Sequence, residues 1–342
     1  MNRLLCGLVC YLMTSASLAN SVVNVYAWGG VIPKKVIQQF EHETGITVHF
    51  STYDSNETLY AKLKSSQKTI YDVVLPSGYY VERMQQQNML EKLDSTQLPN
   101  LENIDPFFKN QDYDPGNQYS VPLVWGATGI FYNHTWINKA PTTWNALWNQ
   151  RFKGQLMLLD DPREVFSIAL LSLGYSPNDD HPDHIKQAYQ KLLTLIPNIK
   201  LFASDGIQAI MIDEDAIAGA TWNNDALKAQ VENKAIQFVY PKEGFVIWVD
   251  CLAIPRNPPH PLEAYQFINF MLKASSSVAI ARDQHLAITN QKGKTELPMT
   301  TLSNEMIYPS PETLKRSHVQ QDVGENTIAL YNHYWQDLKL AF

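Results

Sequence analysis

The feature that most constrains the fold of this chain is a regular alternation of strand-like and helix-like segments that begins at residue 22. Runs of β-branched and aromatic residues predict strands at residues 22–28, 46–53 and 71–75. Apolar residues at helical spacing follow each strand, and the first helix is opened by Pro33 and ended by Gly45. Such a series predicts an α/β fold, in which parallel strands form a sheet with helices on its faces.

The alternation resumes in the second half of the chain. Strands are predicted at residues 155–159, 216–220, 235–240 and 245–254, and helices at residues 164–173, 185–195, 262–272 and 326–340. Between the two series, residues 121–132 contain Trp125-Gly126-Ala127 and predict a segment that crosses from one lobe to another. A chain of 342 residues also suits two lobes better than one core. We therefore predict two α/β lobes, each with a mixed sheet flanked by helices.

Residues 1–19 have the pattern of a cleaved secretory signal peptide. Arg3 supplies a basic start, residues 4–13 are apolar, and small residues precede a cut after Ala19. The apolar run is too short to span a bilayer as a helix. We predict that the protein is exported and that the signal is removed.

Composition after cleavage restricts the class of partner. Loss of Arg3 leaves 26 basic residues against 34 acidic ones, a net charge of −8, which argues against nucleic acid as a partner. Cys6 and Cys10 leave with the signal, so Cys251 is the last cysteine and no internal disulfide can form. Because Cys251 falls inside a predicted strand, we interpret it as a buried thiol and not as a nucleophile.

Two tryptophans that each lie close to a carboxylate suggest a pocket for an organic cation. Trp248 and Asp250 are two residues apart in a predicted strand and therefore share one face. Trp222 and Asp225 follow the predicted strand at 216–220. An indole face attracts cations, and a carboxylate pairs with an ammonium group. The alternative is that each pair is a core tryptophan next to a solvated acid.

Further polar and aromatic residues fall just after predicted strands. They are Trp28, Ser77, Tyr79, Asp161 and Glu164. Ligands of open α/β sheets sit beyond the carboxyl ends of the strands, so these residues are candidates for a site between the lobes. Structural roles compete with this interpretation, because Asp161 precedes a proline as a helix N-cap does and Glu164 in a first turn complements the helix dipole.

Other chemistries find weaker support in the sequence. The run at residues 179–184 is rich in Asp and His, but a capped helix start with Pro182 in its first turn explains it better than a metal site. The sequence contains no Gly-x-Ser-x-Gly elbow, phosphate loop or dinucleotide fingerprint. We therefore predict no metal, no cofactor and no enzymatic activity. A secreted hydrolase that uses Asp161 and Glu164 as its carboxylate pair is kept as an alternative.

A family resemblance runs along almost the whole chain. Its most specific segments are Tyr26-Ala-Trp28, Ser51-Thr-Tyr-Asp-Ser-Asn-Glu57, Tyr60-Ala-Lys-Leu63, Val74-Leu-Pro-Ser77, Val124-Trp-Gly-Ala-Thr128, Asp160-Asp-Pro-Arg-Glu-Val-Phe166, Pro241-Lys-Glu-Gly244, Asp250-Cys-Leu-Ala-Ile-Pro255 and Gln321-Asp-Val-Gly324. The chain resembles the periplasmic polyamine-binding proteins, the substrate receptors of spermidine/putrescine ABC transporters. The resemblance implies a two-lobe periplasmic binding protein fold of type II that closes over a ligand in the interlobe cleft. It also implies a monomer that docks on an inner-membrane ABC permease.

The resemblance also implies roles for individual residues. The aromatic walls around the ligand would be Trp28, Tyr79, Trp222 and Trp248. The ammonium partners would be Asp161, Glu164 and Asp250. Additional hydrogen bonds would come from Ser77 and Gln320. Asp225 matches an acid found in putrescine-preferring members.

The chain departs from the spermidine-binding pattern at two places. Gly29-Gly30-Val31 stands where those receptors carry Thr-Glu-Tyr, and Leu286 replaces an aromatic residue. We predict a receptor that captures a polyamine, putrescine or spermidine, and delivers it to an ABC transporter. The alternative is a two-lobe receptor for another organic cation or another small solute, and Tyr79-Tyr80 is the feature to check for an iron receptor. We expect one lobe to comprise residues 20–126 and about 250–295, and the other residues 127–249 and about 296–342.

Overall fold

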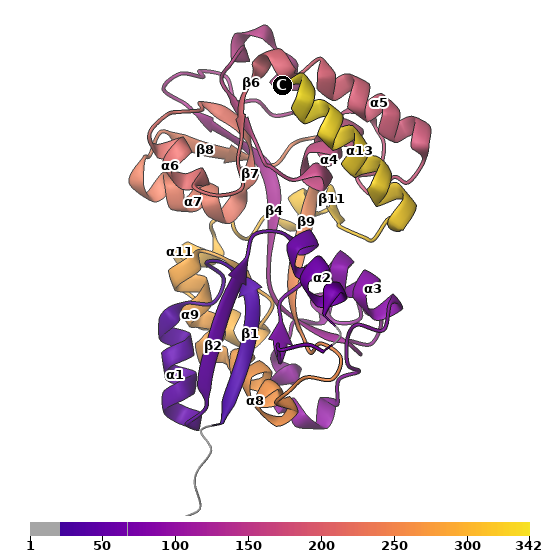
Figure 1. Cartoon of the computed structure of the whole chain (residues 1–342). Coiled ribbons are helices and arrows are strands. Elements are labelled where there is room, and N and C mark those ends of the chain that lie inside the picture. The colour runs from indigo at the N-terminus through magenta and orange to yellow at the C-terminus, as the bar shows by residue number, and fades with distance from the viewer. Residues whose placement is uncertain (1–20, 67) are drawn as a thin grey trace, which may run out of the picture.

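The long strand β4, Ser120–Asn133, runs through the middle of the molecule and enters both lobes (Figure 1). The computed structural model describes residues 21–66 and 68–342. The predicted signal peptide at 1–19 lies outside these described residues. Within them, no helix combines the length and apolar character that a membrane crossing requires.

The first lobe, which we call the N-terminal lobe, begins with the predicted alternation. Its strands are β1 (Val22–Trp28), β2 (Thr47–Tyr53) and β3 (Val73–Val74), and its first helices are α1 (Lys34–Thr44), α2 (Asn56–Ser65) and α3 (Gly78–Gln86). Strand β1 pairs in parallel with both β2 and β3, which confirms the parallel arrangement predicted for this series. Gly45 ends α1 in the left-handed region at φ 71°, where glycine has no side chain to clash.

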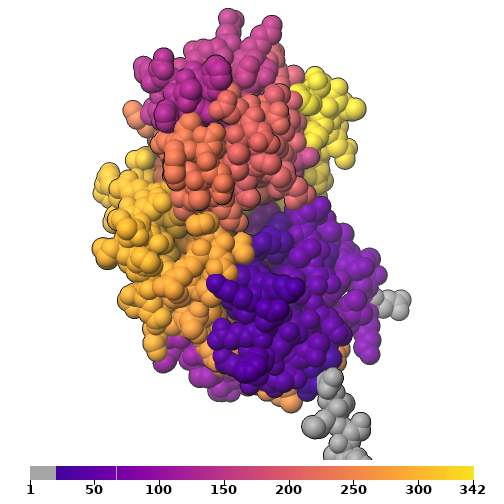
Figure 2. All heavy atoms as spheres, turned by 90° about the vertical axis from the view of Figure 1, so that its left-hand side faces the viewer, coloured from indigo at the N-terminus to yellow at the C-terminus, as the bar shows by residue number. Residues whose placement is uncertain are grey.

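Later parts of the chain complete this lobe. They are three short 3-10 helices (Ser95–Gln97, Pro99–Asn103 and Pro106–Phe108), helices α8 (Pro261–Met271), α9 (Ala274–Gln284), α10 (Gln291–Thr295) and α11 (Met299–Leu302), and strand β10 (Ala287–Ile288). Figure 2 shows the orange and gold residues of α8 to α11 packed beside the indigo start of the chain in one half of the molecule.

The second lobe repeats the plan with other strands. Its strands are β5 (Leu156–Leu158), β6 (Ile199–Phe202), β7 (Ala218–Trp222) and β8 (Ile236–Val239). Its helices are α4 (Pro162–Leu173), α5 (Pro182–Leu193), α6 (Ile207–Ile212), α7 (Asn223–Glu232) and α13 (Glu325–Ala341), with 3-10 helices at Trp144–Trp148, Gln150–Phe152 and Ile196–Asn198. The segment between the lobes near the C-terminus contains α12 (Pro311–Leu314) and β11 (Ser317–Val319).

The two lobes share one mixed sheet. Strand β9, Phe245–Ala253, lies between β3 and β4 and is antiparallel to both. The strand order along the sheet is β2-β1-β3-β9-β4-β7-β5-β6. Because β4 and β9 both continue from one lobe toward the other, the predicted crossing at 121–132 is confirmed and a second crossing accompanies it.

The buried side chains separate into clusters that follow the two halves. The largest cluster joins β1, β3 and β9 to α8 and also includes Ile307 and Tyr308. A second cluster gathers β5, α4 and α5 with Tyr331 and Leu338 of α13. A third, small cluster lies under α6 and α7 in the second lobe. The first cluster includes the start of β4, whereas the second and third include residues near its end, so each lobe has a core of its own.

Candidate functional site

A cavity of about 280 Å³ lies between the lobes, where strands of both halves end. All ten residues proposed from the sequence line it, namely Trp28, Ser77, Tyr79, Asp161, Glu164, Trp222, Asp225, Trp248, Asp250 and Gln320. The structure thus brings together residues that are up to 292 positions apart in the chain. Their role in ligand binding stays a prediction at this point.

One end of the cavity is built around Asp250. Trp248 and Asp250 lie on the same face of β9, as their spacing predicts, and both reach the cavity wall. The Ser77 hydroxyl donates to Asp250 Oδ1 at 2.7 Å, and Asn56 Nδ2 donates to Ser77 Oγ at 3.1 Å. Burial raises the pKa of Asp250 to about 7, against the opposing effect of the Ser77 hydrogen bond. No ion pair between residues 21–66 and 68–342 includes Asp250, so in this part of the chain its carboxyl is buried without a cationic partner.

Two more carboxyl groups lie at the start of α4. Asp161 Oδ1 accepts a hydrogen bond from the Glu164 backbone N–H at 3.0 Å, so Asp161 caps the helix and lines the cavity at the same time. Burial raises the pKa of both groups and is the largest cause in each case. The second cause is a nearby negative charge, that of Glu57 for Asp161 and that of Asp161 for Glu164. The pair therefore holds a proton more readily than two solvated carboxylates do.

The opposite side of the cavity is formed by α7. Asp225 lies in the first turn of this helix and accepts a hydrogen bond from Gln208 Nε2 at 2.6 Å. Burial raises the pKa of Asp225, while Gln208 and Lys228 act in the other direction. Trp222 directs its indole N–H toward Glu164 Oε1, at 3.5 Å, and not toward Asp225. Trp222 and Asp225 both line the cavity, and the indole N–H of Trp222 contacts Glu164 of α4.

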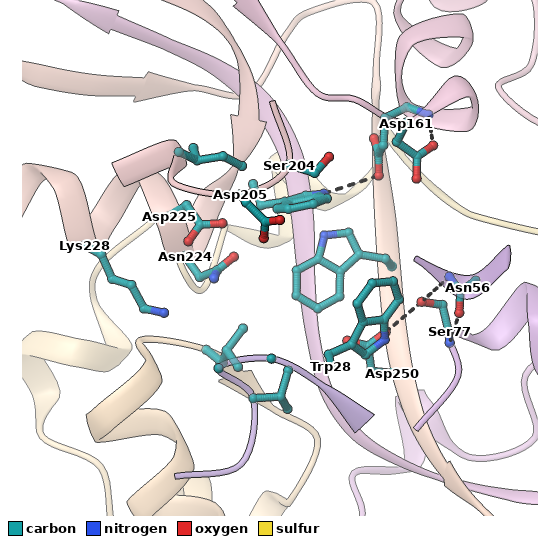
Figure 3. A pocket seen from close by; sticks show the side chains of 18 of the residues that line it. Trp28, Asn56, Ser77, Asp161, Ser204, Asp205, Asn224, Asp225, Lys228 and Asp250 are labelled. Atoms are coloured by element: carbon teal, nitrogen blue, oxygen red, sulfur yellow. Dashed lines mark hydrogen bonds between the residues drawn. The ribbon is translucent and has the colours of Figure 1, made fainter. Parts of the chain in front are cut away.

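Tryptophans form the walls between the two ends (Figure 3). Trp28 ends β1 and packs against Tyr53 with ring centroids 4.7 Å apart. The Trp248 ring occupies the space that a side chain on Gly126 would need. Four buried polar atoms of cavity-lining residues make no hydrogen bond to any described residue: Trp28 Nε1, Glu164 Oε2, Asn224 Oδ1 and Trp248 Nε1. Such atoms are normally paired, so they point to a ligand that completes the site.

Several residues of the cavity wall are not among the candidates proposed from the sequence. They are Asn56, Ser204, Asp205, Gly206, Ile207, Gln208, Asn224 and Lys228. Lys228 lies three positions after Asp225, so a helix prediction for 223–232 would have placed both on one face. Ser204 and Asp205 follow β6, and the rule that ligands lie beyond strand ends would have found them had that strand been predicted.

The metal-like run at 179–184 has a structural role. His181 caps α5 and accepts a hydrogen bond from the Asp183 backbone N–H, and His184 Nδ1 lies 2.9 Å from Asp179 Oδ2. In the described part of the chain, no group of three or more His, Cys, Asp or Glu side chains is arranged to hold a metal ion. The helix start predicted at Pro182 is confirmed.

Two lobes on a shared mixed sheet, with an acidic and aromatic cleft between them, define a solute-binding protein. A comparison with known families agrees, because the model of the bacterial extracellular solute-binding proteins matches residues 35–298. The chain belongs to this family.

Individual relatives cover nearly the whole chain. It is 41% identical to the spermidine/putrescine-binding periplasmic protein 1 of Haemophilus influenzae, over 96% of this chain and 91% of that protein. It is 39% identical to the Escherichia coli spermidine/putrescine-binding periplasmic protein, over 94% of this chain and 92% of that protein. The solved spermidine/putrescine ABC transporter substrate-binding protein of Streptococcus pneumoniae superposes with a TM-score of 0.82 at 35% identity and covers 94% of this chain and 99% of its own.

These findings confirm the resemblance and the two-lobe α/β class predicted from the sequence. The relatives are substrate-binding proteins of transport systems and not enzymes, so they support the receptor interpretation over the secreted hydrolase.

Proposed function

We propose that this protein captures a polyamine, putrescine or spermidine, in the interlobe cleft and delivers it to an ABC permease for uptake. The observation that carries the proposal is a cleft in which Asp161, Glu164, Asp225 and Asp250 are withdrawn from water beside three tryptophans. Withdrawal from water disfavours the charged form of a carboxyl, and an ammonium ligand restores it. The relatives are named as spermidine/putrescine-binding proteins, and these names point to the same ligands.

Each element of the cleft fits one part of such a ligand. One ammonium group would lie against Asp250 and the α4 carboxyls, and a second against Asp225 on the far side. The methylene chain between them would lie along the indole faces, which attract cations and cover apolar surface. Ser77 and Gln320 would supply further hydrogen bonds.

Ligand capture would shift an equilibrium between open and closed arrangements of the lobes. Trp28, Ser77 and Tyr79 come from the N-terminal lobe, whereas Asp161, Glu164, Trp222 and Asp225 come from the second lobe. A ligand that contacts both sets can make all of these contacts only when the lobes are closed, so it stabilises the closed state. We propose that the permease recognises this state, that the protein acts as a periplasmic monomer after its signal is removed, and that nucleic acid is not a partner.

The proposed lobe boundaries follow the sequence division, with residues 20–126 and about 250–295 in one lobe and the remainder in the other. The packing of Ile307 and Tyr308 in the largest core supports extending the N-terminal lobe to about residue 308.

Isothermal titration calorimetry tests the proposal directly. The protein is unfolded in guanidinium chloride, dialysed to remove bound solutes, refolded and titrated at pH 8 with putrescine, spermidine, cadaverine and agmatine. We expect micromolar or tighter binding of at least one of them. Absence of heat with all four, from protein whose circular dichroism shows correct refolding, would exclude the proposal. Native mass spectrometry of protein purified without unfolding would then identify the ligand by its mass.

A further inference from the structure

Lys228 is a positive charge in a cleft that is otherwise acidic. Among the described residues that line the cavity it is the one basic side chain, against the carboxyls of Asp161, Glu164, Asp205, Asp225 and Asp250. It extends from α7, whereas Asp161 and Asp250 lie on the opposite side of the cavity (Figure 3).

The Lys228 ammonium reaches across the cleft toward the N-terminal lobe. Its Nζ lies 3.4 Å from Gln284 Oε1 at the end of α9. The same Gln284 Oε1 is the nearest atom, at 3.9 Å, to a Cβ built on Gly30, and a Cβ built on Gly29 would meet nothing within 4 Å. Lys228 therefore extends to a part of the cleft that the two glycines leave without side chains.

Lys228 is only partly neutralised at this position. None of the ion pairs found between described residues includes it, although its charge does favour ionisation of Asp225. Asp225 Oδ1 accepts its hydrogen bond from the neutral Gln208 amide, and the Lys228 ammonium donates to the neutral amide oxygen of Gln284, so neither contact pairs the two charges directly. A ligand charge placed beyond Asp225 thus meets a fixed positive charge.

We propose that Lys228 restricts the cleft to ligands with two ammonium groups, because its own ammonium takes the place of a third. This inference rests on the proposed function and names the preferred ligand class, short diamines over triamines. A diamine places one ammonium near Asp250 and the α4 carboxyls and the other near Asp225. A triamine must bring its third ammonium toward Lys228, and juxtaposed like charges are a common means of excluding a ligand.

The contrary role for Lys228 is to pair with a carboxylate of the ligand, such as that of an ω-amino acid. Asp205 and Asp225 lie on the same side of the cavity (Figure 3) and disfavour an anionic group there, whereas a diamine would meet these carboxyls with its second ammonium and leave Lys228 to face only a third one. We therefore assign the lysine to exclusion of a third cation, and make the amino acid an outcome of the test.

The test compares wild-type protein with Lys228→Met, Lys228→Arg and a control, Lys234→Met. Met keeps the length of the side chain without its charge, and Arg keeps the charge. Lys234 is an exposed lysine just after α7, outside the cavity wall, so its loss changes net charge equally. Dissociation constants for putrescine, spermidine and γ-aminobutyrate are measured by calorimetry on refolded protein.

We expect wild-type protein to bind putrescine at least about tenfold more tightly than spermidine, and Lys228→Met to reduce that ratio by about tenfold or more. Lys228→Arg and Lys234→Met should keep the wild-type ratio. An unchanged ratio in Lys228→Met, with putrescine binding intact, overturns the inference and leaves the proposed function standing. Tighter binding of γ-aminobutyrate than of putrescine, abolished in Lys228→Met, also overturns it. Failure of wild-type protein to bind any polyamine instead refutes the proposed function.

Discussion

Replacing Asp250 by Asn should weaken ligand binding and stabilise the empty protein in the same variant. Asn has nearly the same shape as Asp, and its Oδ1 can still accept the hydrogen bond that Ser77 donates at 2.7 Å. The substitution therefore removes the charge and leaves most of the packing around this 5% exposed side chain unchanged. The negative charge of Asp250 favours binding of an ammonium ligand but destabilises the folded, ligand-free protein because the group is buried. Its removal should therefore weaken binding and increase the free energy of unfolding.

The size of each effect follows from the burial of Asp250. Loss of one partner of a buried, hydrogen-bonded charge pair costs about 2–5 kcal/mol of binding free energy. For folding, the pKa of about 7 lies about three above the ordinary value of 3.8, and each pKa unit corresponds to about 1.4 kcal/mol. Keeping Asp250 ionised in the folded, empty protein therefore costs about 4 kcal/mol of unfolding free energy above pH 7. An amide N–H left without a partner in the Asn variant offsets about 1–3 kcal/mol of this gain.

The pH dependence separates the charge from the amide. Because the folded pKa is raised, the folded state binds more protons than the unfolded state, and the stability of wild-type protein falls as pH rises from about 4 to 7. The amide contribution does not change with pH. The difference in unfolding free energy between Asp250→Asn and wild type should thus increase by about 3 kcal/mol between pH 5 and pH 8.

Urea unfolding of ligand-free protein at both pH values, followed by circular dichroism, measures this difference. Calorimetry with putrescine at pH 8 measures the binding loss. Asp180→Asn is the matched control, because Asp180 is an exposed carboxylate in the connection between α4 and α5. Unchanged affinity would mean that Asp250 does not contact the ligand. A stability difference that stays constant from pH 5 to pH 8 would mean that Asp250 is not a strained carboxylate, and the reasoning from its burial would fail.

Three further predictions follow from other contacts. Affinity for a diamine should fall between pH 6.5 and 5.5 by about tenfold per pH unit for each cleft carboxyl that must release a proton to bind, because these carboxyls have raised pKa values; constant affinity in calorimetry would contradict this. Gly126→Ala should displace the Trp248 ring and weaken binding by about tenfold, with an altered tryptophan emission spectrum; unaltered emission and affinity would refute the displacement. Arg83→Met should lower the free energy of unfolding by about 3–5 kcal/mol, because Asp322 then stays buried and unpaired. Lys315→Met, which breaks an exposed ion pair, should change it by less than about 1 kcal/mol, and equal effects in urea would contradict the role of burial.

Local sequence patterns were sufficient for the elements with strong end signals. Helix α1 lies between Pro33 and Gly45 as predicted, since proline fixes φ at the start and glycine adopts the left-handed conformation at the end. Helix α7 was not predicted, because its apolar residues Ala226, Leu227 and Ala229 form a weak stripe. The strand predicted at 71–75 is paired only at Val73–Val74, since pairing depends on where neighbouring strands begin and end.

The candidate site could be proposed from the sequence because its members end strands or lie two apart within one. Trp28 at the end of β1 and the Trp248–Asp250 pair on β9 are examples. A residue such as Gln208, within the short helix α6, reaches the cavity through tertiary packing, and no predicted strand end in the sequence connects it to the site. The antiparallel insertion of β9 between β3 and β4 also has no local signal, because pairing partners far apart in the chain are selected by the assembled core.

Burial and binding make opposite demands on the same carboxyl groups. Asp161, Glu164 and Asp250 are buried away from water, and burial raises their pKa values. Keeping these carboxyls ionised at neutral pH therefore lowers the stability of the folded, ligand-free protein. In the proposed function a cationic ligand would supply the missing partners, and the free energy released would be largest in a closed arrangement, where water is excluded most completely. The cost of burying unpaired carboxylates would then favour an open ligand-free state and closure upon capture, as proposed above. A variant that replaces one of these carboxyls by a neutral group should therefore be more stable to unfolding. It should also bind the ligand less tightly and close less readily on binding, and the proposed transport role depends on that closure.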